Sequence, residues 1–118
     1  MANTLKPEVK AVLEAAATNV TYQRPQTWAV MPAVSWSETA NREAEQVDGL
    51  EYTTEFAYSI DIWGSSQSQV DGVFDLIDTG MRALGFRREF AQDLPDPSDV
   101  RHKTTRYRAY LVKDKIYP

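Results

Sequence analysis

One stretch of the sequence alternates between two kinds of side chain over eleven residues. Large apolar side chains or threonine fill every second position, which are Tyr52, Thr54, Phe56, Tyr58, Ile60 and Ile62. Because successive side chains in a β-strand point to opposite faces, this period of two predicts a strand with one buried face. At about 3.3 Å per residue the strand would be roughly 35 Å long, which is more than one small core usually covers. We therefore expect part of it to project beyond the core.

The next segment changes to helical spacing. Its apolar residues recur every three or four positions, at Val70, Val73, Phe74, Ile77, Met81 and Leu84. Ser66 and Gln69 have the spacing of a capping box, and Gly85 supplies a stop. The pattern predicts a helix from Ser66 to Gly85 whose apolar stripe lies against a sheet.

The first forty residues carry weaker signals. Apolar residues at helical spacing predict a helix over about 4–17, with Asn3 or Thr4 as its cap. A short strand at 20–22 then leads into a proline-bearing connection, and 33–37 reads as a half-buried strand in which Val34 and Trp36 share one face. The polar, acidic segment Thr39–Gly49 is interpreted as a loop or hairpin tip.

The C-terminal third adds two further strands. They are expected at 86–90 and 102–112, separated by an aspartate- and proline-rich loop at 93–99. In the last strand Arg106, Arg108 and Tyr110 would face away from the buried side. The order of elements predicts one α+β domain spanning residues 1–118, with a mostly antiparallel sheet and two helices packed on one face.

Little in the sequence points to catalysis. The chain has no cysteine, which favours an intracellular folding compartment, and one histidine, His102, flanked by two basic residues. Asp71, Asp75 and Asp78 are interpreted as the solvated face of the second helix. No phosphate-binding or nucleophile motif is present. We expect no catalytic residue, no cofactor and no metal ion.

Two alternative functions, calcium binding and nucleic-acid binding, have weaker support in the sequence. The aspartates of the 93–99 loop suggest calcium, but the loop lacks the glycine and the distal glutamate of an EF-hand. Basic and aromatic residues alternate near the C-terminus, yet a pI of about 4.9 is opposite to that of a dedicated nucleic-acid binder. No apolar run approaches the roughly 20 residues that span a bilayer. We therefore expect neither nucleic-acid nor membrane binding.

The charge is divided along the chain. Residues 1–80 hold 12 acidic and 4 basic side chains, whereas residues 81–118 hold 5 acidic and 9 basic ones. One interpretation is that these charges only solvate the surface. The other is that an acidic patch on one copy meets a basic patch on the next.

The order of these segments resembles the tail-completion or tail-terminator proteins of long-tailed bacteriophages and prophages. The resemblance covers nearly the whole chain. It rests on the strand Phe56-Ala57-Tyr58-Ser59-Ile60-Asp61-Ile62-Trp63-Gly64, the Ser/Gln-opened helix ending in Leu84-Gly85-Phe86, the Asp-Leu-Pro loop and the basic strand from His102 to Arg108.

The resemblance implies a virion structural protein, assembled in the bacterial cytoplasm and located at the tail end or neck. Six copies would form a ring that caps the tail tube, ends tail polymerisation and meets the head–tail connector. Its partners would be itself, the tail tube protein and the connector protein. A neck or head-completion protein, and a small enzyme or ligand-binding module, remain alternatives. Candidate residues for contacts between copies or with partners are Glu43, Glu45, Arg87, Arg88, Arg101, Arg106 and Arg108.

Overall fold

The computed structural model describes residues 4–23, 30–43, 53–95, 99–112 and 115–118. In chain order the elements are α1 (Lys6–Ala16), β1 (Asn19–Tyr22), β2 (Ala33–Glu43), β3 (Thr53–Gly64), α2 (Gln67–Leu84), β4 (Arg87–Leu94), β5 (Arg101–Val112) and β6 (Lys115–Tyr117). The strands form one sheet in the order β1-β2-β3-β5-β4, with β6 paired to the end of β5. All neighbouring strands are antiparallel except β1 and β2. The predicted α+β class is confirmed.

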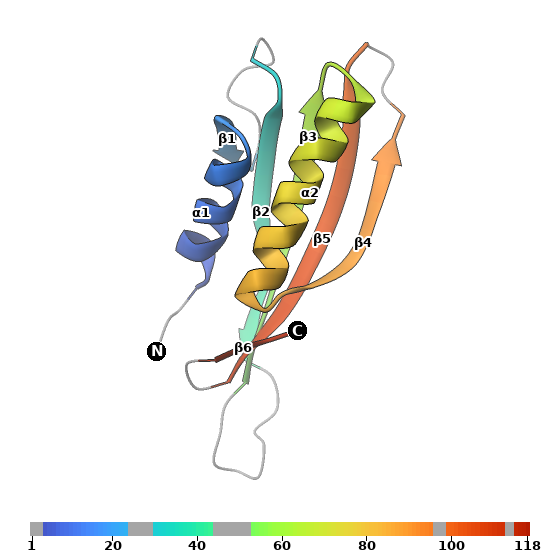
Figure 1. Cartoon of the computed structure of the whole chain (residues 1–118). Helices are drawn as coiled ribbons and strands as arrows, with labels where there is room; N and C mark the ends of the chain where they lie inside the picture. Colours follow the sequence, from blue (N-terminus) through green and yellow to red (C-terminus); the bar gives the residue numbers. More distant parts are fainter. Residues whose placement is uncertain (1–3, 24–29, 44–52, 96–98, 113–114) are drawn as a thin grey trace.

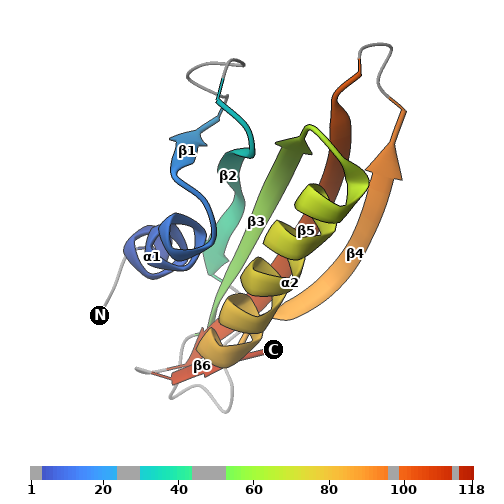
Figure 2. The same ribbon diagram turned by 45° about the horizontal axis from the view of Figure 1, so that its top comes forward.

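Both helices lie on the same face of the sheet, as predicted (Figure 1). In the view turned by 45°, α1 lies beside β1 and β2, and α2 crosses β3 and β5 (Figure 2). Beyond the C-terminal end of α2, the ends of β2, β3 and β5 continue past the helix (Figure 1). Every described residue of β3 is nonetheless buried or half-buried, so the expected projection of the long strand beyond the core stays a prediction.

The core lies between the helices and the central strands. Phe56, Tyr58, Ile60 and Ile62 of β3 are fully buried, as are Tyr107 and Ala109 of β5. The buried face of α2 adds Val70, Val73, Ile77 and Met81. These are the faces that the two periodicities predict. Burying a side chain of this size contributes about 1.5–3 kcal/mol, which outweighs the cost of the glycines in α2.

The ends of α2 are close to the prediction. The Ser66 hydroxyl accepts a hydrogen bond from the Gln69 amide at 3.2 Å, but the Gln69 side chain accepts from Ser65 N–H rather than from Ser66. At the other end Gly85 has φ 104°, and the Phe86 amide donates to the Met81 carbonyl at 3.0 Å. A left-handed glycine with this hydrogen bond terminates the helix.

The start of α1 differs from the expectation. Leu5 is the N-cap residue, and Asn3 lies outside the described residues. The Thr4 hydroxyl accepts a hydrogen bond from Lys6 N–H at 3.1 Å and donates one to Glu38 at 2.8 Å. Thr4 therefore attaches the start of α1 to β2 as well as satisfying a free amide of the first turn.

The loop prediction for Thr39–Gly49 was wrong over its first part. Residues Thr39–Glu43 continue β2. Ala40–Glu43 is in register with Thr54–Ala57 of β3 after a bulge at Thr39, and 44–52 lie outside the described residues. Asp93 and Leu94, predicted as loop, likewise belong to β4. In both places the strand is held by backbone pairing while its side chains stay mostly exposed, so no apolar alternation marks it.

Two further expectations needed correction. Ala33, Val34, Ser35 and Trp36 are all buried, not only one alternate pair, because β1 and β3 flank this part of β2 on both sides. The acidic side of α2 is not uniformly solvated. Asp71 and Asp78 reach toward the sheet, and of the three only Asp75 is exposed.

Candidate interaction surface

The face of the sheet that is turned away from the helices carries a chain of ion pairs. We call this face the open face. The members of the ion-pair chain are Arg42, Glu55, Glu89, Arg106 and Arg108. Glu55 on β3 pairs with Arg42 on β2 and with Arg108 on β5. Glu89 on β4 lies 2.9 Å from Arg108 Nε and 3.0 Å from Arg106 Nε, the second contact being an ion pair without hydrogen-bond geometry. The chain thus links four neighbouring strands.

Glu55 is the centre of this chain. Its side chain is only 8% exposed, and burial by itself would favour the protonated carboxyl. Hydrogen bonds from Arg42 and Arg108 outweigh burial and hold the pKa of Glu55 below its usual value of 4.5. The pKa of Arg108 is raised, first by its hydrogen bond to Glu89 and then, despite burial, by Glu55. Both carboxylates are therefore paired within the chain, and three arginines against two glutamates leave a net charge of +1.

The structure divides the candidate residues into separate groups. Arg106 and Arg108 belong to the open-face chain, while Arg88 lies on the helix side, 3.2 Å from Asp78 and over the Phe74 ring. Arg87 and Arg101 are exposed. In the described ranges no ion pair reaches either of them. Their role in contacts between copies stays a prediction.

Of the two acidic candidates, one lies in the described residues. Glu43 is the exposed last residue of β2, and no ion pair within the described part of the chain reaches it. Glu45 lies outside the described residues. Glu43 and Arg87 thus belong to β2 and β4, which are separated by β3 and β5.

The sheet ends in β4 on one side and in β1 on the other. Most residues of β4 are exposed, including Phe90 at 45%. β1 pairs with Ala33–Trp36 of β2, and the Tyr22 hydroxyl accepts a hydrogen bond from Glu38 N–H at 3.0 Å. Beyond that point Ala40–Glu43 of β2 pairs with Thr54–Ala57 of β3.

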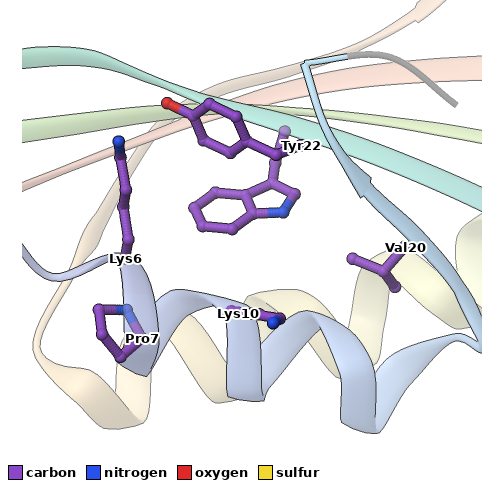
Figure 3. A pocket seen from close by; sticks show the side chains of 6 residues that line it. Lys6, Pro7, Lys10, Val20 and Tyr22 are labelled. Carbon is purple, nitrogen blue, oxygen red and sulfur yellow. The ribbon is translucent and has the colours of Figure 1, made fainter.

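A groove runs between α1 and β1 (Figure 3). It measures about 540 Å³ and is lined by Lys6, Pro7, Lys10, Val20, Tyr22 and Trp36. The Lys6 ammonium lies 4.8 Å from the centre of the Tyr22 ring, and Tyr22 packs edge-on against Trp36. Among the described residues that line it, the charged groups are the ammoniums of Lys6 and Lys10. This groove could hold an anionic group.

A second groove, of about 510 Å³, lies between the two helices. It is mostly apolar and includes Leu76, which is 58% exposed, and Gly80. Gly80 is required by close packing, because a Cβ atom there would approach Val12 Cγ1 to 2.5 Å.

His102 lies at the start of β5, as the sequence indicates. Its Nε2 is 2.9 Å from Asp61 Oδ1, and its ring stacks on Trp63 with centroids 4.5 Å apart. In the described residues no three His, Asp or Glu side chains cluster as metal ligands would, and Asp96 of the loop considered for calcium lies outside them. No helix in the described parts of the chain is both long and apolar enough to cross a bilayer.

No family model and no curated protein matches this chain. Among solved structures, its fold is similar to a chain in a structure described as the virion of a native gene transfer agent particle. The TM-score is 0.59, and the alignment covers 88% of this chain and 88% of that one, with 13% identical residues. At this identity the likeness establishes that the two chains share a fold over most of their length.

Proposed function

We propose that this chain is a structural protein of a phage-like virion that forms a ring on the end of the tail tube. The observation that carries the proposal is the similarity in fold to a chain of a gene transfer agent virion over 88% of both chains. In this role the ring ends tail polymerisation and presents a surface for joining the head. The protein would be made in the bacterial cytoplasm and incorporated at the tail end or neck.

The shape of the sheet supports assembly into a ring. A cyclic oligomer needs two different surfaces on each copy, so that the front of one meets the back of the next. The sheet ends in β4 on one side and in β1 on the other, with exposed Arg87 on β4 and exposed Glu43 on β2, the strand beside β1. We propose six copies, with the tail tube protein and the head–tail connector as further partners.

The use of the carboxylates supports a structural role over an enzymatic one. Glu55, Asp71 and Asp78 each bind basic side chains of neighbouring strands or helices. A catalytic acid requires a carboxyl whose pKa is raised by an apolar pocket. The pKa values of these three are instead lowered by hydrogen bonds and nearby cations, which at Glu55 and Asp78 must first overcome burial.

Deleting the gene from the genome that encodes it tests the proposal. Electron microscopy of the resulting lysate should show tails of uncontrolled length without attached heads, and supplying the gene on a plasmid should restore normal particles. Tails of normal length beside separate heads would favour a neck or head-completion role instead. Particles indistinguishable from wild type in length and yield would contradict both roles.

A further inference from the structure

We infer that the groove between α1 and β1 binds the acidic segment at the end of β2, residues 43–51, of a neighbouring copy. The inference rests on the proposed ring and names one contact that would build it. The basic groove of each copy would receive the acidic segment of the next, so the same contact would repeat around the ring.

The groove combines two cations with an aromatic surface (Figure 3). Tyr22 and Trp36 pack edge-on with their ring centroids 4.8 Å apart, and α1 contributes Lys6 and Lys10. Tyr22 is 38% exposed, although it is a large aromatic side chain. Such a site suits a carboxylate next to an apolar side chain, because the ammoniums pair with the first and the rings cover the second.

The two lysines are not consumed by pairing within the chain. No ion pair in the described residues reaches Lys6 or Lys10. Lys6 lies over the Tyr22 ring and also helps to lower the pKa of Glu38, but less than the hydrogen bonds to that carboxylate do. These hydrogen bonds come from three other side chains, Tyr58, Thr4 and Asn41. Glu38 is thus already bound, and both ammoniums remain available to a carboxylate from outside.

The proposed occupant has the complementary charge. Residues 43–51 hold four acidic side chains and no basic one, more acids than any other nine consecutive residues of the chain. Val47 precedes Asp48 and Leu50 precedes Glu51, so the segment twice places an apolar side chain beside a carboxylate. Complementary charge of this kind sets the orientation of two surfaces and suppresses wrong pairings.

The length of the segment favours a neighbouring copy over the same copy. Trp36 pairs with Ile60 and Glu43 with Thr54, so Glu43 lies six residues of β3, or about 20 Å, beyond the level of Trp36. Ten peptide links join Glu43 to Thr53, and half of them span at most about 18 Å when fully extended. Even if the segment ran straight back along β2, its midpoint would stop short of Trp36. A second copy has no such restriction.

The two sites lie at different places on each copy. The groove is level with Trp36 on the β1 side of the helical layer, and the acidic segment follows the far end of β2. A contact between two different surfaces is heterologous and gives a ring where the rotation closes, rather than a two-fold dimer. In this contact the cations come from α1 and not from the basic C-terminal third.

An exchange of charge tests the contact. Lys6→Glu with Lys10→Glu reverses the groove, and Glu45→Lys with Asp48→Lys reverses the segment. In producing cells that lack the wild-type gene, either pair should lower the amount of this protein in purified particles about tenfold or more, because repulsion replaces attraction. The fourfold variant restores opposite charges at every contact and should recover most of the wild-type amount.

The matched control is Lys115→Glu, at an exposed lysine of β6 that has no ion pair in the described part of the chain. It should be incorporated as wild type, and circular dichroism checks that every variant is folded. A folded groove variant with normal incorporation would overturn the inference. So would a fourfold variant that stays as low as the two pairs. A defect in the groove variant with none in the segment variant would assign the groove to another partner, which also overturns it.

Carbodiimide cross-linking of wild-type particles is an independent measurement. The reagent takes up water as it joins an ammonium and a contacting carboxylate in an amide. Mass spectrometry should find peptides that link Lys6 or Lys10 to residues 43–51, and a denaturing gel should show a ladder of covalent oligomers. Wild-type rings without such links, or links from these lysines to a different virion protein, would overturn the inference while leaving the proposed function intact. Absence of the protein from particles and from any oligomer would overturn the proposed function and this contact with it.

Discussion

The Tyr107 hydroxyl donates a hydrogen bond of 2.7 Å to Asp78 Oδ1, which joins β5 to α2 through the core. Asp78 also pairs with Arg82 at 2.9 Å and with Arg88 at 3.2 Å. Burial of Asp78 opposes its ionisation, but these partners hold its pKa below 3.8. The same contact raises the pKa of Tyr107, after the larger effect of burial. A charged group on the helix is thus bound by a fully buried tyrosine on the sheet.

Tyr107→Phe is expected to lower the free energy of unfolding by about 1–2 kcal/mol, because it removes a hydrogen bond to a charged acceptor but leaves the ring packed. Asp78 keeps its two arginines, which limits the loss. Urea denaturation followed by circular dichroism at pH 7 measures it. Tyr117→Phe, at a tyrosine that is 47% exposed, is the matched control and should change stability by less than about 0.5 kcal/mol. Equal effects at the two sites would contradict this account.

Two glycines of α2 should respond to alanine in opposite ways. Alanine favours a helix by up to about 1 kcal/mol over glycine, so Gly72→Ala should stabilise the protein, since nothing lies within 4 Å of the added Cβ. At Gly80 the added Cβ would approach Val12 Cγ1 to 2.5 Å, and Gly80→Ala should destabilise the protein by about 1–3 kcal/mol through overpacking. Thermal unfolding of the two variants compares them directly. Stabilisation by both would show that α1 moves away from α2 at little cost.

Glu55→Gln should make stability less sensitive to acid. The folded pKa of Glu55 is lowered, so its charge contributes stability above pH 4.5 that is lost as the pH falls through the folded pKa. At pH 7 the variant should lose about 1.5–3 kcal/mol, the range for a hydrogen bond to a charged group. Below pH 4.5 its unfolding free energy should approach that of wild type. Urea titrations at pH 7 and pH 3.5 give the comparison, and a constant difference between the proteins would argue against ionised Glu55.

Sequence patterns predicted the elements whose large apolar side chains line one face. The β3 and α2 periodicities exist because one face of each is packed in the core, and the Gly85 stop reflects a local backbone requirement. Thr39–Glu43 and Asp93–Leu94 could not be recognised, since backbone pairing holds these strand ends while solvent reaches most of their side chains. The same limit applies to the charges. Arg106 and Arg108 cannot be distinguished from Arg87 by type or spacing, because only the register with β3 and β4 places Glu55 and Glu89 beside them.

Charge reversals should therefore separate folding from assembly. Arg106→Glu with Arg108→Glu places two carboxylates beside Glu55 and Glu89, so this double variant should be strongly destabilised as a monomer. Arg87→Glu with Arg101→Glu changes two exposed side chains that have no ion pair in the described structure. Its unfolding free energy should stay within about 1 kcal/mol of wild type.

If the exposed cations contribute to contacts between copies, Arg87→Glu with Arg101→Glu should still weaken assembly, because favourable charge across the interface is replaced by repulsion. Native mass spectrometry at low and high salt, with circular dichroism on the same samples, measures both properties. A folded variant that assembles as wild type at every salt concentration would show that Arg87 and Arg101 do not contribute to the interface. In that case the contact between copies would depend on other exposed residues such as Phe90, because Arg106 and Arg108 are already paired with Glu55 and Glu89 within each copy.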